Sequence, residues 1–217
     1  WKMIVFFKNM HQMSHPIKSV VFDLDGVLID SRPVMEISWG LIQEKYSLVQ
    51  PFSEYFKNIG IPFIEIMKAI GVNDNHVEIK NDYFSYTHEN IEKIKAYNHS
   101  YDIFHLLKNK NIITGIITSK ERKNTLAICS RYGFSPDEII TPNDVKKGKP
   151  CIDQGQEYLK RTGLNSQDVL YVGDMESDFI FAKNINFHFA FANYGYGNIN
   201  GTNFNRIDGL LDIMEII

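Results

Sequence analysis

The 217-residue chain has only two cysteines, Cys129 and Cys151, and no apolar run long enough to cross a membrane. Two cysteines cannot build the disulfide framework of a small secreted domain, and neither has a partner at metal-ligand spacing, so we expect two free thiols. The apolar stretch at residues 3–7 lacks a small-residue cleavage site, which argues against a signal peptide. These absences predict a soluble, cytoplasmic protein without a membrane partner.

An excess of charge of either sign is also lacking. The chain has 23 Lys and Arg against 26 Asp and Glu, a formal net charge of −3 and a pI near 6.2. This balance gives no general reason to expect nucleic-acid binding. The length, with 44% hydrophobic residues, suffices for one core and a smaller attached domain.

The chain does contain a short apolar run, 20–22, that leads directly into Asp23, Asp25 and Gly26. Such a run predicts a buried strand of a parallel sheet, and ligands bind at the carboxyl ends of these strands. Two carboxylates this close repel each other unless a divalent cation binds or one of them is protonated. Gly26 permits a sharp turn and a close ligand. Alone, the pattern could also be a strand end with an Asp-Gly turn.

Residues 32–97 are predicted to be a helical block without a convincing strand. Asp30 or Ser31 can cap its first helix, and Pro33 suits the first turn. The spacing of apolar residues predicts helices over 32–46, 51–57, 63–71 and from about 73 toward 96. An all-helical insert after a first strand indicates a cap rather than a continuation of the sheet.

Strands and helices alternate in the remainder of the chain. The predicted strands are 18–22, 112–118, 138–141, 168–172 and 187–191, and the predicted helices are one capped by Ser100, then 121–132, 152–162, 176–184 and a closing amphipathic helix over 207–217. This alternation predicts right-handed crossovers and helices on both faces of a parallel sheet. We therefore expect an α/β, Rossmann-like, doubly wound core of about five strands over 1–31 and 98–217, with a helical cap over 32–97.

Three further strand ends carry polar residues that would meet at one edge of the sheet. Thr118 and Ser119 follow the second strand, Lys149 lies in the loop after the third, and Asp174 and Asp178 follow the fourth. Each has an ordinary explanation alone: a β-branched strand end, a helix cap, a solvated loop charge, or acids in the first turn of a helix. Their joint occurrence at successive strand ends favours a functional site.

Carboxylates, a hydroxyl and a lysine are the groups needed to transfer a phosphoryl group to a carboxylate. Mg²⁺ takes one or two carboxylates, and Asp174 with either Asp23 or Asp25 could supply them. A lysine neutralises phosphate charge, and a hydroxyl with backbone N–H groups binds the equatorial oxygens. A carboxylate nucleophile splits hydrolysis into two easier steps, and a second carboxylate can protonate the leaving group and activate water.

The same segments resemble the four motifs of the haloacid dehalogenase superfamily of phosphatases and phosphomutases. The matching segments are Asp-Leu-Asp-Gly-Val-Leu-Ile-Asp-Ser at 23–31, Thr118 after an apolar strand, Gly148-Lys149-Pro150, and Gly-Asp-Met-Glu-Ser-Asp at 173–178. The similarity covers 18 to about 197 and looks like the phosphoglycolate phosphatase and beta-phosphoglucomutase branch. Ile152 replaces a proline common in that branch, and Ile185-Asn186 replaces Ala-Gly, although neither position carries chemistry.

The resemblance implies a nucleophile, an acid and a metal site. Asp23 would become phosphorylated. Asp25 would be the general acid and base and would offer its backbone carbonyl to Mg²⁺. Asp174 would bind Mg²⁺, and Asp178 would support the metal shell or the lysine. The implied metal set is Asp23, Asp25, Asp174 and Asp178.

The resemblance also implies a phosphate-binding set. Thr118 would hold the phosphoryl group, with help from the backbone of Leu24 and Ser119. Lys149 would neutralise charge between the nucleophile and the phosphate.

The leading interpretation is a Mg²⁺-dependent phosphomonoester hydrolase that acts on a small phosphorylated metabolite through an aspartyl-phosphate. One alternative is a sugar phosphomutase of the beta-phosphoglucomutase type; another is a non-catalytic binding or regulatory protein, against which the complete motif set counts. Asp25 disfavours carbon–halogen cleavage and phosphonoacetaldehyde hydrolysis, because such members resemble this pattern without that aspartate. The substrate stays open, with Arg32, His76 and His88 as candidate contacts, and so does the choice between monomer and homodimer.

Overall fold

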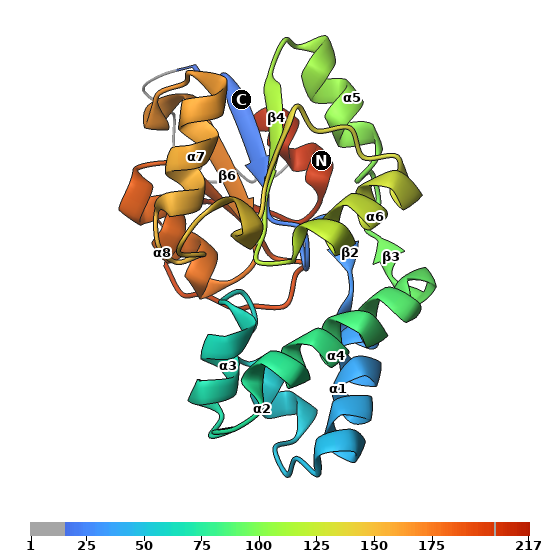
Figure 1. The fold of residues 1–217 in the computed structure, drawn as a ribbon. Helices are drawn as coiled ribbons and strands as arrows, with labels where there is room; N and C mark the ends of the chain where they lie inside the picture. The colour runs from blue at the N-terminus through green and yellow to red at the C-terminus, as the bar shows by residue number, and fades with distance from the viewer. Residues whose placement is uncertain (1–15, 202) are drawn as a thin grey trace, which may run out of the picture.

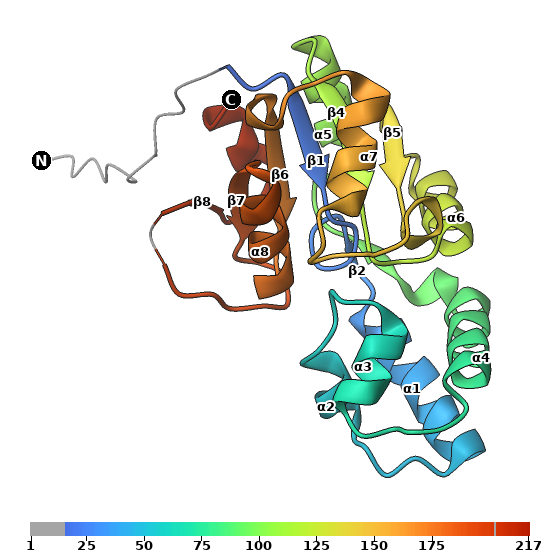
Figure 2. The same ribbon diagram turned by 60° about the vertical axis from the view of Figure 1, so that its left-hand side comes forward.

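The computed structural model describes residues 16–201 and 203–217, so residues 1–15 of the predicted core lie outside the described part. Its main sheet has six parallel strands in the order β5-β4-β1-β6-β7-β8, which are labelled in Figure 2. The strands are β1 (Ser19–Phe22), β4 (Ile113–Ile117), β5 (Glu138–Ile140), β6 (Val169–Gly173), β7 (His188–Ala192) and β8 (Asn205–Ile207). This arrangement confirms the predicted parallel α/β fold.

Helices cover both faces of the sheet. The helices are α5 (Asp102–Asn109), α6 (Arg122–Tyr132) and a 3-10 helix (Leu210–Glu215) on one face, and α7 (Asp153–Thr162) and α8 (Glu176–Ile185) on the other. All four β1 residues are buried, with Val20 and Phe22 in one apolar cluster and Val21 in the other. Successive side chains of a strand point to opposite faces, so a strand covered on both faces is mostly apolar, and the one polar residue of β1, Ser19, has a hydrogen-bond partner in the hydroxyl of Tyr158.

Four further helices form a separate layer beyond the carboxyl ends of the strands (Figures 1 and 2). They are α1 (Arg32–Tyr46), α2 (Phe52–Phe56), α3 (Phe63–Ala69) and α4 (His76–Glu89). They share their own apolar cluster, in which the rings of Trp39 and Tyr55 stack with centroids 4.7 Å apart. Below we call this layer the cap; its predicted domain limits, 32 and 97, stay a prediction.

The chain enters and leaves the cap through a small antiparallel pair, β2 (Ile29–Asp30) and β3 (Lys95–Ala96). The expectation of no strand within 32–97 is therefore wrong at its end, because α4 stops at Glu89 and a 3-10 turn, Ile91–Lys93, precedes β3. The hydroxyl of Ser100 donates to the carbonyl of Leu28 (2.7 Å) instead of capping the next helix. The predicted end of the last cap helix near residue 96 and the predicted helix cap at Ser100 are therefore both replaced by contacts between the two connections.

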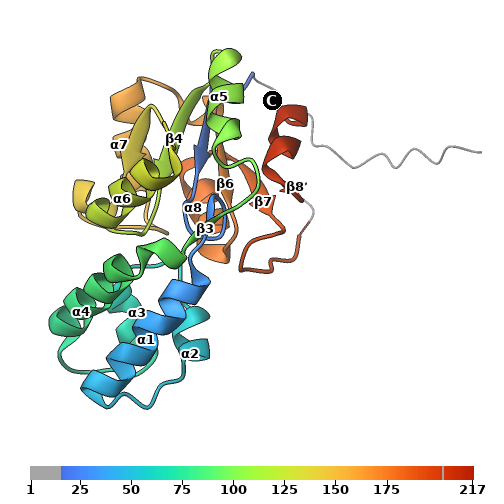
Figure 3. The ribbon, with the colours of Figure 1, turned by 90° about the vertical axis from the view of Figure 1, so that its right-hand side faces the viewer.

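The C-terminal segment also differs from prediction. A sixth strand, β8, reaches Ile207, and a six-residue 3-10 helix replaces the expected amphipathic helix over 207–217 (Figure 3). The three-residue strand lies in a polar stretch rich in asparagine, so apolar periodicity could not identify it. Cys129 and Cys151 are free, as expected. Across the described ranges, no helix is both long and apolar enough for a membrane span.

Candidate active site

Three neighbouring strands end side by side beneath the cap, and each delivers one predicted site residue. Asp23 follows β1, Thr118 follows β4 and Asp174 follows β6. The ends are level because Phe22 pairs with both Ile116 and Val172. The parallel sheet thus brings together residues that lie far apart in the sequence.

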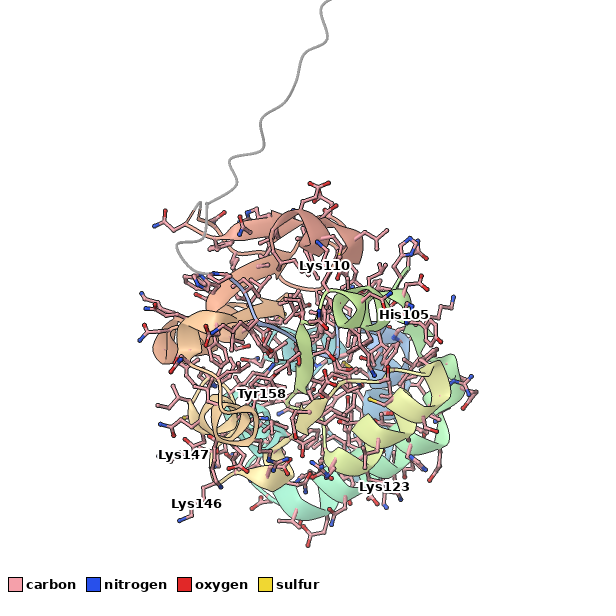
Figure 4. The ribbon with its side chains drawn as sticks, turned by 90° about the horizontal axis from the view of Figure 1, so that it is seen from above. His105, Lys110, Lys123, Lys146, Lys147 and Tyr158 are labelled. Carbon is pink, nitrogen blue, oxygen red and sulfur yellow. The ribbon has the colours of Figure 1, made fainter. Side chains whose placement is uncertain are left out.

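Lys149 is fully buried and holds the nucleophile candidate. Its Nζ lies 3.0 Å from Oδ1 of Asp23 and 2.7 Å from Oδ1 of Asp178. Burial lowers the pKa of Lys149, but Asp178 and Asp23 raise it further, and the net pKa is above its ordinary value. Lys146 and Lys147 are exposed and project from the rim of the molecule (Figure 4). The solvated-charge interpretation therefore applies to these two lysines and not to Lys149.

Gln154 fixes the loop that carries Lys149. Its side-chain oxygen accepts from the backbone N–H of Lys149 (3.1 Å), and its amide group donates to the carbonyl of Thr118 (2.9 Å). The buried Gln154 side chain thereby ties the lysine loop to the end of β4.

Asp178 uses both carboxylate oxygens in hydrogen bonds. Oδ1 accepts from Lys149 and from the hydroxyl of Tyr171 (3.1 Å), and Oδ2 accepts from the backbone N–H groups of Asp174 (3.2 Å) and Met175 (3.0 Å). The two predicted roles of Asp178, support of the lysine and support of the metal shell, are both compatible with this geometry, because one oxygen contacts Lys149 and the other contacts the backbone beside Asp174.

Asp174 is completely buried, and only one of its two carboxylate oxygens accepts a hydrogen bond from the described residues. Its Oδ2 accepts from the backbone N–H of Tyr196 (2.7 Å), while Oδ1 has no hydrogen-bond partner within 16–201 and 203–217. A Cβ on Gly26, whose φ is +81°, would lie 2.1 Å from Asp174 Oδ2, so glycine is required there for both conformation and space.

The three carboxylates carry more negative charge than the single lysine neutralises. Oxygen atoms of Asp23, Asp174 and Asp178 lie within 4.8 Å of one another. Burial, with further contributions from Asp178 and Asp25, raises the pKa of Asp23 to about 7 against the opposing effect of Lys149. Burial likewise raises the pKa of Asp174 well above its usual range. Such a group of oxygen ligands fits a hard divalent cation.

The side chain of Asp25 points away from this group. Its Oδ1 lies 3.1 Å from Nζ of Lys120 and accepts a hydrogen bond from the hydroxyl of Ser31. The predicted metal role of Asp25 can therefore concern its backbone carbonyl only, since its carboxylate lies outside the cluster of three.

A pocket of about 60 Å³ separates the site from the cap. Its core wall is Asp23, Asp25, Thr118, Ser119, Lys120 and Met175, and its cap wall is Met35, Tyr55, Ile59, Gly60, Ile61, Phe63, Ile66, Tyr83 and Phe84. The Ser119 hydroxyl donates to the Gly60 carbonyl (3.0 Å), so the tip of the cap touches the core. Arg32, His76 and His88, the candidate substrate contacts, are not among the residues that line this pocket.

The predicted phosphate-binding residues face this pocket or frame it. Oγ1 of Thr118 accepts from the backbone N–H of Lys120 (3.1 Å), which leaves its own proton available to a ligand. The backbone N–H of Leu24 faces the Asp23 carboxylate and favours its charged form. Because the Ser119 hydroxyl is used by Gly60, only its backbone can take the predicted role.

Sequence reasoning gave no site role to Ser31, Gln154, Tyr171 or Tyr196. Lys120 stands with Thr118 and Ser119 among the polar residues at the end of the second predicted strand, but no role of its own was predicted for it. The partners of Gln154, Tyr171 and Tyr196 lie on other elements, and their spacing in the chain gave no indication of the contacts.

Comparison with known proteins places this geometry in a family. The model of the haloacid dehalogenase-like hydrolases matches residues 20–192. Pyrophosphatase PpaX of Oceanobacillus iheyensis is 28% identical over 174 residues, which are 78% of this chain and 80% of that protein. The glyceraldehyde 3-phosphate phosphatase of Methanocaldococcus jannaschii is 27% identical over 175 residues, 73% of this chain and 76% of that protein.

Solved structures show the same fold. The crystal structure of a predicted phosphoglycolate phosphatase from Haemophilus somnus superposes with a TM-score of 0.80 at 22% identity and covers 94% of this chain and 99% of that chain. CbbY from Rhodobacter sphaeroides, solved in complex with phosphate, gives a TM-score of 0.79 at 15% identity and covers 91% of this chain and 96% of that one. Together with the family model, which spans well over half of the sequence, these findings show that the chain belongs to the haloacid dehalogenase-like hydrolases.

Proposed function

We propose that the protein is a phosphatase in which Asp23 attacks the phosphorus of a small phosphorylated molecule and forms an aspartyl-phosphate. The observation that carries this proposal is the Asp23 carboxylate, buried, paired with Lys149 and placed at the floor of the pocket under the cap. The relatives named as phosphatases and pyrophosphatases support the same reaction class. A non-catalytic protein would have no need to retain this buried charge arrangement.

Mg²⁺ is the metal that we propose for the site. Asp23 and Asp174 would hold it, with the backbone carbonyl of Asp25. The unpartnered Oδ1 of Asp174 and the surplus of carboxylates over lysine support this fit. When bound, Mg²⁺ neutralises the charge of the nucleophile and of the phosphoryl oxygens.

The chain's own residues would then perform the two steps. Lys149 favours the charged form of Asp23 and orients its carboxylate, and the Thr118 hydroxyl donates to a phosphoryl oxygen. Asp25 would give its proton to the leaving oxygen and later take one from the attacking water. Lys120 and Ser31 orient Asp25 toward the pocket.

The pocket favours a small, anionic leaving group. Lys120 is the single cation among the described residues that line it, and the cap wall is otherwise apolar or aromatic. The names of the relatives suggest pyrophosphate and glyceraldehyde 3-phosphate as the first substrates to test.

Purified protein is expected to release phosphate from p-nitrophenyl phosphate and from a small-metabolite panel only when Mg²⁺ is present. The physical reason is that a carboxylate cannot approach an anionic ester while its charge is unbalanced. Phosphate release would be measured with Mg²⁺, in excess chelator, and after Mg²⁺ is restored. Full turnover in chelator would contradict the metal site, and no turnover on any ester would contradict the phosphatase.

Lys120→Met is expected to weaken turnover of pyrophosphate about tenfold more than turnover of p-nitrophenyl phosphate. The lysine would face the second phosphate of pyrophosphate, whereas the nitrophenolate leaving group spreads its charge and needs less help. The measurement is kcat/KM for both substrates, with Lys123→Met on the exposed surface as the matched control. Equal losses on both substrates would show that Lys120 acts only through Asp25.

A further inference from the structure

A short loop after β7 touches both connections between the core and the cap. We call residues 194–197, Tyr-Gly-Tyr-Gly, the tyrosine loop. The ring of Tyr194 packs edge-on against Tyr97, which follows β3, with centroids 5.0 Å apart. The ring of Tyr196 packs against Phe56 of α2 in the same way, at 5.2 Å. One core loop therefore contacts the cap and the chain that leads out of it.

The hydroxyl of Tyr196 holds the first turn of the cap. Ser31, the N-cap residue of α1, uses its own hydroxyl on Asp25, so this hydroxyl does not cap the first N–H groups of the helix. Tyr196 Oη accepts from the N–H of Ser31 (2.7 Å) and of Arg32 (3.2 Å), and it donates to Oδ1 of Asp30 (3.1 Å), to which the Arg32 N–H also donates (3.2 Å). A phenol has one donor and two acceptor sites, so these contacts use it fully.

The backbone of the same residue holds the metal carboxylate. The N–H of Tyr196 donates to Oδ2 of Asp174 (2.7 Å). A Cβ on Gly195 would lie 2.3 Å from Asp174 Cβ, and one on Gly197 would lie 2.2 Å from the Asp174 carbonyl oxygen. The tyrosine loop is thus pressed against Asp174 on both sides, and the loop cannot shift without moving this contact.

We propose that Tyr196 is a positioning residue that couples the Asp174 carboxylate to the start of α1, where the chain enters the cap. We call this connection the hinge. A metal ion at Asp174 fixes the tyrosine loop, and the fixed loop holds the first turn of α1 through its hydroxyl. Since coupling between two sites is reciprocal, the hinge contact in turn strengthens metal binding. This inference rests on the metal site proposed above.

The test is hydrogen exchange of the segment 29–35, followed by mass spectrometry with and without Mg²⁺. In the wild type, Mg²⁺ is expected to slow exchange in this segment about tenfold. The reason is that a fixed tyrosine loop would strengthen two hydrogen bonds that oppose local opening of the segment. Tyr196→Phe keeps the ring and the backbone N–H but should lose this protection. Tyr46→Phe, which removes a hydroxyl bonded to Asp82 within the cap, is the matched control and should keep it.

Calorimetry on the same samples separates the outcomes. The expected result is a Mg²⁺ dissociation constant severalfold higher in Tyr196→Phe than in Tyr46→Phe. Gly195→Ala, which disturbs the other end of the connection, should weaken both Mg²⁺ binding and protection of 29–35. Unchanged Mg²⁺-induced protection in Tyr196→Phe would overturn the coupling. Absence of Mg²⁺ binding to the wild type would instead overturn the metal site itself, and the coupling with it.

Discussion

Asp23→Asn is expected to lower kcat by about 10⁴-fold or more on every phosphate ester. An amide is a far poorer nucleophile and metal ligand than a carboxylate. Among the described residues, Asp23 is the one pocket-lining carboxylate that pairs with Lys149, so no other can replace it. Phosphate release by the purified variant is the measurement. Asp74→Asn, at an exposed position of the cap, is the matched control and should retain full activity.

The same variant should not lose stability, which separates a catalytic role from a structural one. Folding raises the pKa of Asp23 from 3.8 to about 7. At pH values between these two, the metal-free folded state therefore holds a proton on Asp23 that the unfolded state has lost. The wild type therefore loses stability relative to Asp23→Asn as the pH rises from about 4 to about 7, and the difference stays constant above that range. Thermal unfolding in chelator at pH 5 and pH 8 measures it.

Two results would count against this account of Asp23. Turnover close to the wild type in a variant purified away from host phosphatases would exclude Asp23 as the nucleophile. The difference in melting temperature between Asp23→Asn and the wild type is the second result. If the variant falls further below the wild type at pH 8 than at pH 5, the buried carboxylate stabilises the fold instead.

The positions that could be predicted are those where the chain itself encodes a strand end. Asp23, Thr118 and Asp174 each follow an apolar run, and parallel strands bring such ends to one edge. The strand positions were right to within a residue or two. The central strands β1, β4 and β6 are buried on both faces and are therefore largely apolar in sequence, which makes them easy to locate.

The residues that could not be predicted act through partners distant in the sequence. Gln154 joins the backbone of Lys149 to that of Thr118, and Tyr196 joins Asp174 to the start of α1. A side chain that bonds to backbone groups leaves no pattern, since backbone groups are the same at every position. The short strands β2, β3 and β8 were missed because two or three residues cannot show a period.

Prediction of individual roles depended on local context. Lys149, in a lysine-rich loop, has the ordinary appearance of a solvated charge, and only the resemblance to the family distinguished it from Lys146 and Lys147. The structure supplies the physical difference, because Asp23, Asp178 and Tyr171 surround its ammonium group while its neighbours face solvent (Figure 4).

Lys149→Met is therefore expected to cost both activity and about 3–5 kcal/mol of stability at neutral pH. Removing the lysine leaves the buried Asp23 and Asp178 carboxylates without their cation, and Asp23 loses the charge that favours its ionised form. The free energy of unfolding, measured by urea denaturation in chelator, should show the loss. Lys146→Met, at an exposed position, should stay within about 0.5 kcal/mol of the wild type.

A double-mutant cycle with Asp178→Asn identifies the cause of this loss. If the cost arises from an unpaired buried carboxylate, the second substitution removes part of it, and the double variant should be more stable than the sum of the single effects by about 1–3 kcal/mol. Strictly additive effects would show that the charge of Asp178 has no part in the loss, because the packing loss is the same whether or not Asp178 is charged. The cycle thus tests directly whether the lysine is retained for its charge, which is the property that the proposed attack by Asp23 requires.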